Sequence, residues 1–374
     1  MSDENKQELT KDELNKGRNE WVHGSYLTEG TLVAFPLCFP GASKSIAPDE
    51  SHITALDITA EGDVYGGTSG HRAHVFVGMF RGATGMVFDM GAIENSSGCV
   101  AVCCGESRFV AFVNGPEGGR MISRSLEPLP FDLLQEWWMS RPPLDDLGAI
   151  VPGEDVIHAV ADRERHFAIG CTDGHLFRVA IETGKSEVID EIDGRAKLAV
   201  GSKGNVFGRD RDNTLWRYDP TENKLTRQAM PLPQADWTPG PLVWAGDPVD
   251  GTLFVADASG RLFSFHEDRG FSASLGQAPL APVTAMSVTH DGRLFGACGE
   301  GIGKIFTHDP RKQETRDLEV AVSVIQKRRY GYQFADAVTG RDGQILLGEN
   351  DNSGHLWIYY PKIRERTEKD SPGV

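Results

Sequence analysis

The sequence predicts an all-β protein built from repeated antiparallel strand units. Segment 342–361, DGQILLGENDNSGHLWIYYP, shows the pattern: a turn at Asp342-Gly343, an apolar run, a polar loop and a second apolar run entered through His355. Glycine supplies the positive φ that a tight reversal needs, and branched or aromatic side chains suit a pleated surface. Because the same order of signals returns along the chain, we expect a repeat of this unit.

Seven stretches carry the repeated pattern, at 53–80, 99–113, 156–189, 196–228, 241–266, 283–310 and 334–361, and the second of them is weak. The aromatic residues of the third runs, Phe177, Trp216, Phe263, Phe306 and Trp357, are 39, 47, 43 and 51 residues apart. A period of this length, with about four short strands in each unit and no helical spacing, is typical of propeller blades. The sequence therefore predicts a seven-bladed β-propeller.

The repeated segments resemble those of the seven-bladed β-propeller superfamily over nearly the whole chain. The match lies in the D-G-x-φ-φ-G and (H/x)-L-(F/W) segments, without a WD or kelch signature. The last unit lacks an outermost strand, whereas a strand candidate without a unit lies at 31–36. We expect Leu32 to Phe35 to pair as the outer strand of the blade that contains Trp357, because ring closure satisfies backbone groups at an open edge. The alternative is that 31–36 only caps a loop.

We expect one propeller domain over 23–363, with a polar tail at 1–22 and a charged tail at 364–374. The stretch 123–150 departs from the repeat and is too long for a simple connection. Phe131, Leu134 and Trp138 have helical spacing there, and Pro142-Pro143 ends the run. The sequence therefore predicts a short helical insertion between the second and third blades.

Composition limits the classes of partner. The chain has 38 basic and 54 acidic residues and a net charge of -16, which disfavours broad contact with nucleic acid or an anionic membrane. It has no apolar run of about 18 residues, and its charged start differs from a secretory peptide, so we expect a cytoplasmic protein. The six cysteines lie mostly in apolar runs without regular spacing, which indicates reduced core residues.

Propeller topology predicts where a site would lie. The links between blades and the loops between the second and third strands share one face, and ligands usually gather there. His74, His175 and His355 occupy equivalent positions at the start of three third strands on that face. Histidine can act as a general base or a metal ligand, so these are candidate catalytic residues; the alternative is that each ring only bonds a neighbouring turn.

The inter-blade links supply further candidates. Lys327-Arg328-Arg329 is the only run of three positive charges in this acidic chain, and arginine suits a carboxylate or phosphate; the alternative is a solvated link. Tyr330 and Tyr332 could transfer a proton, provide an aromatic platform or pack within a blade. The remaining candidates for substrate binding come from links and loops and are Arg209, Arg211, Trp137, Trp138 and Trp237.

These residue types favour an enzyme acting on an acidic sugar. Elimination next to a uronate needs a base for the α proton, a cation for the enolate-like charge and a proton donor for the leaving oxygen. In fold and residue types the chain resembles propeller polysaccharide and oligosaccharide lyases, which implies His, Tyr and Arg chemistry or a divalent metal held by His. The expected substrate is a small acidic saccharide.

Two other function classes remain open. One is a non-catalytic propeller that binds a protein partner across the same face. The other is a metal-dependent propeller lactonase or hydrolase, for which the acidic loops at 210–213 and 349–352 would form the site. Neither loop has the glycine and distal glutamate of a calcium loop.

Overall fold

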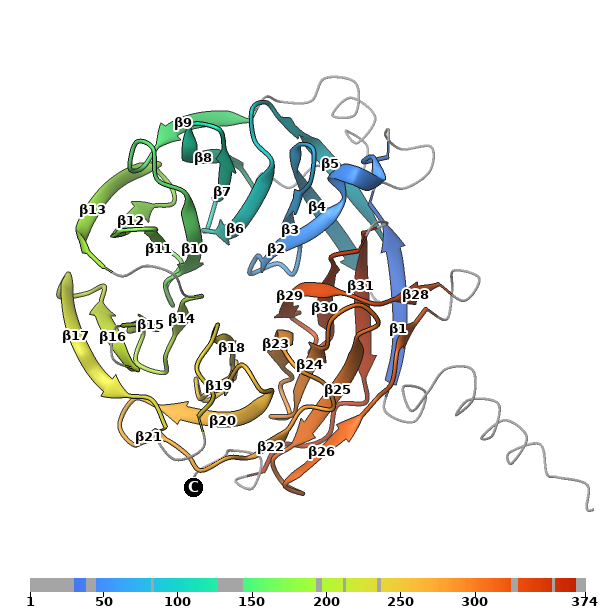
Figure 1. Ribbon diagram of the computed structural model, residues 1–374. Helices are drawn as coiled ribbons and strands as arrows, with labels where there is room; N and C mark the ends of the chain where they lie inside the picture. The colour runs from blue at the N-terminus through green and yellow to red at the C-terminus, as the bar shows by residue number, and fades with distance from the viewer. Residues whose placement is uncertain are drawn as a thin grey trace, which may run out of the picture.

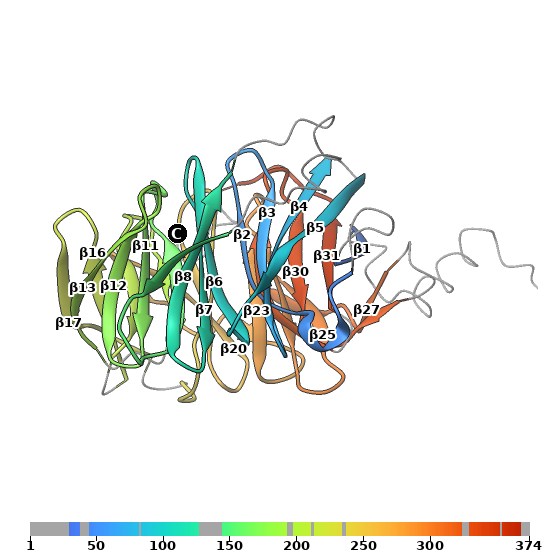
Figure 2. The same cartoon turned by 90° about the horizontal axis from the view of Figure 1, so that it is seen from above.

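The computed structural model describes residues 30–37, 45–81, 84–126, 144–192, 197–210, 213–233, 237–323, 329–351 and 354–367. Their strands form antiparallel sheets arranged around a central axis, so the chain is an all-β propeller (Figure 1). Seen from the side, the sheets stand next to one another around a disc (Figure 2). No helix within the described ranges has both the length and the apolar character needed to cross a bilayer.

The first half of the ring is built from consecutive strands, each group running from the hub outward. The first group contains β2 (His52–Ile58), β3 (Val64–Ser69), β4 (Ala73–Arg81) and β5 (Thr84–Ile93), preceded by a 3-10 turn, η1 (Pro48–Glu50). The second contains β6 (Gly98–Cys104), β7 (Arg108–Gly115), β8 (Gly118–Ser125) and β9 (Asp145–Ala149), and the third contains β10 (Val156–Ala161), β11 (Phe167–Thr172), β12 (His175–Ala180) and β13 (Lys185–Glu191). A single pairing of Ser69 with Gly98 joins the first two groups into one eight-stranded sheet.

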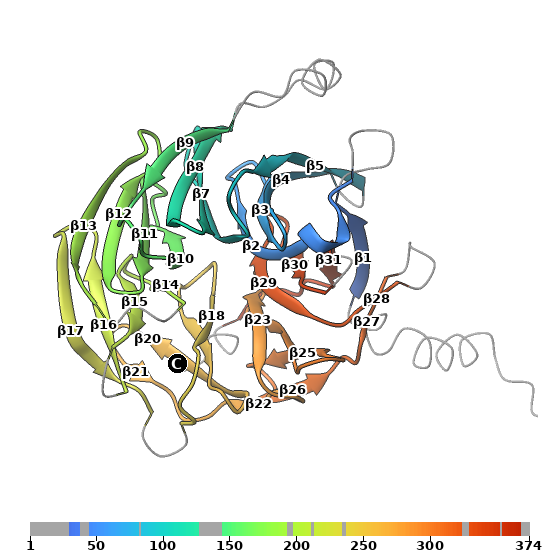
Figure 3. The same ribbon diagram turned by 45° about the horizontal axis from the view of Figure 1, so that its top comes forward.

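The second half repeats this order. Its strands are β14 (Ala199–Val200), β15 (Val206–Arg209), β16 (Thr214–Asp219) and β17 (Lys224–Pro231), then β18 (Val243–Gly246), β19 (Leu253–Ala256), β20 (Arg261–His266), β21 (Gly270–Phe271) and β22 (Gly276–Gln277), then β23 (Val283–Val288), β24 (Leu294–Cys298), β25 (Lys304–Asp309) and β26 (Glu314–Asp317). A two-stranded sheet of β27 (Ala321–Val322) and β28 (Tyr330–Gly331) follows. The inner strands β2, β6, β10, β14, β18, β23 and β29 surround the hub (Figure 3).

The last sheet unites the two ends of the described chain. It has the order β1 (Gly30–Pro36), β31 (His355–Pro361), β30 (Ile345–Glu349) and β29 (Phe334–Thr339). β1 is antiparallel to β31, and Ala34 lies opposite Trp357. The predicted pairing of Leu32 to Phe35 with the Trp357 strand is therefore present.

The position of the predicted insertion is wrong. β9 pairs with β8, with Met121 opposite Gly148, so residues 145–149 complete the second sheet. The stretch 127–143 consequently lies inside the second group, between its third and fourth strands, and its predicted helix lies outside the described residues. The polar residues of 145–149 gave no strand signal, because an outer strand needs little apolar burial.

Glycines in the second strands make room for the aromatic residues of the third strands. Register places Gly66 opposite Phe76, Gly170 opposite Phe177, Gly208 opposite Trp216 and Gly296 opposite Phe306. A Cβ atom at Gly208 would lie 2.2 Å from Cζ2 of Trp216, closer than real contacts allow. The aromatic side chain lies over the backbone of the glycine on the neighbouring strand. This contact explains why, in the sequence, a run that contains glycine is followed by a run that contains an aromatic residue.

The hydrophobic core is divided among the spaces between neighbouring sheets. Ring centroids of Phe112 and Phe177 lie 5.6 Å apart, those of Phe207 and Phe265 lie 5.0 Å apart, and those of Phe295 and Tyr359 lie 5.1 Å apart. Each of these pairs joins two successive groups, and a cluster of buried apolar side chains lies between every two neighbouring groups around the ring, so each group is buried on both faces. The five described cysteines are buried and none of them forms a disulfide, in agreement with the sequence prediction of reduced core residues at those positions.

Candidate functional site

The predicted histidines are the first or second residues of third strands, and the end of the disc where these strands start is called the histidine face below. His74 contacts two carboxylates, with Nε2 2.9 Å from Oε2 of Glu50 and Nδ1 3.1 Å from Oδ1 of Asp89. Nδ1 of His175 lies 2.9 Å from Oε1 of Glu154. The three histidines occupy three different sheets, on β4, β12 and β31.

His355 belongs to a buried polar cluster. The fully buried carboxylate of Glu349 receives hydrogen bonds from Nε1 of Trp357 at 3.1 Å and from the guanidinium of Arg329 at 3.2 Å, and Nδ1 of His355 lies 3.1 Å from it. Burial opposes ionisation of Glu349, but these hydrogen bonds outweigh it and hold the pKa of the carboxyl below its ordinary value. Arg329 is therefore engaged with a carboxylate of its own chain.

The Glu50 cluster has the same electrostatic character. The hydrogen bond from Arg72 is the main reason that the pKa of Glu50 falls to about 2. Burial would lower the pKa of His74, but its hydrogen bonds with Asp89 and Glu50 outweigh burial and raise it. At His74 these contacts join a link to a strand and stabilise the charged forms of both partners.

The other predicted site residues are distributed over the ring. The rings of Tyr330 and Tyr332 are parallel within 4°, with centroids 6.3 Å apart, and 44% and 38% of these residues is exposed. Arg209 donates a hydrogen bond of 2.9 Å to the carbonyl of Gly240, and the ring of Trp237 packs 5.4 Å from that of Phe263. Arg211, Arg328, Trp137 and Trp138 lie outside the described residues.

A channel of about 420 Å³ occupies the hub and is lined by residues that sequence reasoning did not select. Its walls are inner strands, and its lining includes Arg163, Gly201 and Asp247 from the turns between first and second strands. We call the end of the disc that carries these turns the inner-turn face; by topology it is opposite the histidine face. A concave cavity with a few converging polar groups is the usual form of a small-molecule site.

Three ionisable groups meet in the channel wall. Nζ of Lys197, which precedes β14, donates a hydrogen bond of 3.0 Å to the carbonyl of Ala335 on β29. The neighbouring carboxyl of Asp336 accepts backbone N–H bonds from Leu56 at 2.8 Å and from Ala337 at 3.0 Å. Burial nevertheless raises the pKa of Asp336, although the Lys197 ammonium acts to lower it. A carboxyl with a raised pKa in a cleft is a candidate for proton transfer.

His158 on β10 is the third group. Burial, assisted by the charge of Lys197, lowers the pKa of His158 to about 3, so its imidazole is neutral at ordinary pH. The backbone N–H of Leu198 donates to Nδ1 of His158 at 3.1 Å. The ring proton is consequently on Nε2, which makes His158 a hydrogen-bond donor through that atom.

An ion pair braces the channel wall. The guanidinium of Arg165 donates to both oxygens of Asp57, at 2.9 and 3.2 Å, and the N–H of Cys104 donates to Oδ2 at 2.7 Å. The Asp57 charge is the main cause of the raised pKa of Arg165. These contacts join the first three groups of strands. Trp244 adds an aromatic surface to the same channel, and its Nε1 donates to the carbonyl of Lys197 at 3.1 Å.

A sequence signal for part of this site exists. His158, Asp57 and Asp336 are ionisable residues within first runs that are rich in apolar residues, VIHAVA, HITALDI and FADAVT. The spaces between sheets are filled by apolar side chains, so an ionisable residue in an innermost strand points to the hub. All three residues line the channel. Within the described ranges, no group of three or more His, Cys, Asp or Glu side chains is arranged to hold a metal ion.

Comparison with known proteins extends the fold assignment. No protein-family model matches the chain, and no curated protein matches it in sequence. The structure is similar to that of a streptogramin B lyase, with a TM-score of 0.62 and 11% identity over 90% of this chain and 99% of that one. It is also similar to an inactive virginiamycin B lyase from Staphylococcus aureus with quinupristin, with a TM-score of 0.60 and 8% identity over 88% and 99% of the two chains.

A third similar structure comes from a protein assembly. A chain of a mitotic checkpoint complex has a TM-score of 0.58 and 13% identity, covering 90% of this chain and 96% of that one. At these identities the similarities concern the fold alone. The chain thus shares a β-propeller fold with proteins that include lyases.

Proposed function

We propose that the central channel of a seven-bladed ring is the active site of a lyase that performs β-elimination on a small uronate-containing saccharide. The observation that carries this proposal is the presence of Asp336, a carboxyl with a raised pKa, beside the Lys197 ammonium in one cavity. A base with a raised pKa and a cation are the two groups that removal of a proton next to a carboxylate requires.

The chemistry follows from these groups. Asp336 accepts the proton α to the substrate carboxylate, the electron pair of that C–H bond forms a C=C bond, and the β C–O bond breaks. The protonated Asp336 then returns the proton to the departing oxygen, so no external reactant is needed. Lys197 stabilises the enolate-like charge, and Nε2–H of His158 donates a hydrogen bond to a substrate oxygen.

The size of the channel and the Lys197 ammonium in its wall support the substrate class. A volume of about 420 Å³ suits a small ligand. Among the described residues no carboxylate lies within ion-pair distance of Nζ of Lys197, whose bond goes to a neutral carbonyl, so the ammonium favours an anionic ligand. Trp244 offers a face on which a sugar ring can stack.

The test is an absorbance assay for the new double bond, with uronate oligosaccharides in one arm and quinupristin in the other. The second arm is included because two structurally similar proteins are named as lyases, one of them with quinupristin. We expect turnover of uronates and a loss of about 10²–10⁴-fold in Asp336→Asn. Asp155→Asn removes an exposed carboxylate near the start of β10 and should retain wild-type turnover.

Two outcomes would reject this assignment. Wild-type turnover in Asp336→Asn would remove the proposed base. Loss of turnover in His175→Ala together with full activity in Asp336→Asn would move the site to the histidine face, where the sequence placed it. If quinupristin were turned over and uronates were not, the channel would remain the proposed active site and the proposed substrate class would be rejected.

A second candidate function is protein binding, and the exposed Tyr330–Tyr332 pair supports it. Ile302, in a turn whose neighbour Gly303 bonds the carbonyl of Tyr332, is 68% exposed and adds apolar surface. Aromatic and aliphatic side chains exposed together are typical of interfaces. A partner captured by the wild type and lost in Tyr330→Ala/Tyr332→Ala, but retained in Asp336→Asn, would favour this function.

A further inference from the structure

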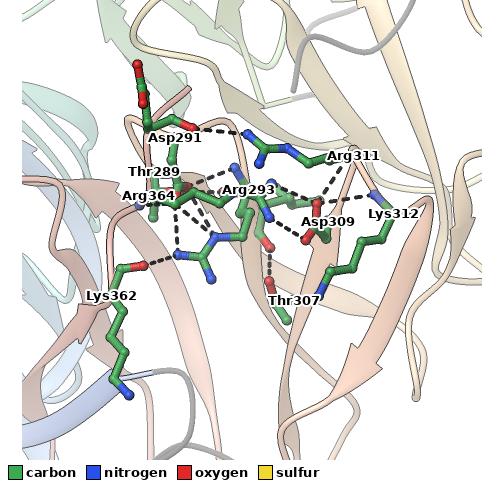
Figure 4. A network of polar contacts seen from close by, with 11 residues as sticks. Thr289, Asp291, Arg293, Thr307, Asp309, Arg311, Lys312, Lys362 and Arg364 are labelled. Carbon is green, nitrogen blue, oxygen red and sulfur yellow. Dashed lines mark hydrogen bonds and ion pairs between the residues drawn. The ribbon is translucent and has the colours of Figure 1, made fainter. Parts of the chain in front are cut away.

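The segment after β31 binds the turns of a neighbouring sheet. The guanidinium of Arg293 donates to the carbonyl of Lys362 at 2.7 Å, and the backbone N–H of Arg364 donates to Oδ2 of Asp291 at 3.1 Å. The Arg364 side chain forms two hydrogen bonds with Asp309, at 2.7 and 2.8 Å (Figure 4). The segment is thereby fixed across the inner-turn face of the sheet that contains β23–β26.

The next arginine reaches the turn of the preceding sheet. The guanidinium of Arg366 donates to Oδ1 and Oδ2 of Asp247, both at 2.8 Å, and to Oδ2 of Asp250 at 2.8 Å. The Asp247 carboxylate is fully buried, and its Oδ1 also accepts the N–H of Val249 at 2.9 Å. Arg366 therefore supports the carboxylate that holds this turn in shape.

That turn belongs to the channel. Asp247, Pro248 and Gly251 line the cavity at the inner-turn face. Two parallel N–H···O bonds to a buried carboxylate are strong and geometrically specific, and removal of the arginine would leave the Asp247 charge buried without its cation. The C-terminal segment and the mouth of the channel are thus joined through one side chain.

We propose that residues 362–366 form a latch that holds the 247–252 turn against the channel mouth, so that release of Arg366 loosens the mouth and changes access to the channel. The effect on turnover rests on the proposed function, whereas the latch itself is a property of the chain without substrate. Arg364 anchors the segment on one sheet, and Arg366 transmits its position to the next.

Hydrogen–deuterium exchange of the full chain tests the latch directly. In Arg366→Gln we expect the amides of Val249, Gly251 and Thr252 to exchange about tenfold or more faster than in the wild type, because local opening of the turn becomes easier. Amides of β23 should exchange as in the wild type, which separates local opening of the turn from a global loss of stability. Arg366→Lys, which keeps the charge without the planar fork, should fall between the two.

A matched control is Arg227→Gln, which removes an exposed arginine of β17 that pairs with Asp190 of β13 and does not line the channel. It should leave exchange at 247–252 as in the wild type. Unchanged exchange at 247–252 in Arg366→Gln would overturn the latch, as would equal acceleration across the whole ring. If the wild type turns over no substrate, the proposed function fails, and the exchange result still decides the latch.

Discussion

Replacement of the buried carboxylate in the closing sheet, Glu349→Leu, should destabilise the protein strongly. Leucine occupies a similar volume, so the change removes the acceptor without opening a large cavity. Nε1 of Trp357 and Nδ1 of His355 would each lose a buried partner at 3.1 Å, and Arg329 would lose its carboxylate at 3.2 Å. Breaking a buried pair in this way costs about 3–5 kcal/mol in the free energy of unfolding.

Urea unfolding followed by tryptophan fluorescence measures this loss, because Trp357 contacts Glu349 directly. Glu349→Gln retains one oxygen acceptor and should cost about 1–2 kcal/mol, which separates loss of charge from loss of the acceptor. Glu106→Gln, at an exposed position, should stay within about 0.5 kcal/mol of the wild type. A loss below about 1 kcal/mol in Glu349→Leu would refute the reasoning, since that is the value of a surface ion pair.

Two further predictions concern acid stability and ring closure. The folded-state pKa of Glu50, about 2, lies below its ordinary value of 4.5, so its interactions stabilise the fold fully above pH 4.5 and are lost as the pH falls toward 2. Urea midpoints of Glu50→Gln should therefore decline less between pH 5 and 2 than those of the wild type; parallel declines would contradict this assignment. Leu32→Ala should lower the free energy of unfolding by about 2–4 kcal/mol, because Leu32 is 1% exposed and packs in the core with Trp357. Thr31→Ala, on the exposed side of β1, should change the free energy of unfolding little. Similar urea midpoints for the two variants would argue against β1 as a structural strand.

The repeat was readable in the sequence because its physical cause is local. An aromatic residue of a third strand needs a small residue opposite it in the second strand, as at Gly208 and Trp216, so each unit carries both signals. The pairing of β1 with β31 could be inferred because one unit lacked a strand and one strand lacked a unit. The outer strand 145–149 could not, since it follows a long insertion and is polar.

The site was harder to predict because its parts come from distant positions. The equivalent positions of His74, His175 and His355 were visible, but the partners Glu50 of His74 and Glu154 of His175 were not, since both glutamates lie in links before the sheets. Lys197 comes close to Asp336 only when the ring closes, because 138 sequence positions separate Lys197 from Ala335, the residue before Asp336. Periodicity within one unit carries no information about contacts across the hub.

The union of β1 with β31 has a consequence for synthesis on the ribosome. Gly30–Pro36 is translated before every other described strand of the ring, yet its partner, His355–Pro361, is translated after all of them. The backbone N–H and C=O groups of β1 therefore lack their β31 partners until the sheets between them have been translated. Closure of the ring is consequently a late folding event of high contact order. Moving this strand by circular permutation to follow β31 would turn the last step into formation of a local hairpin.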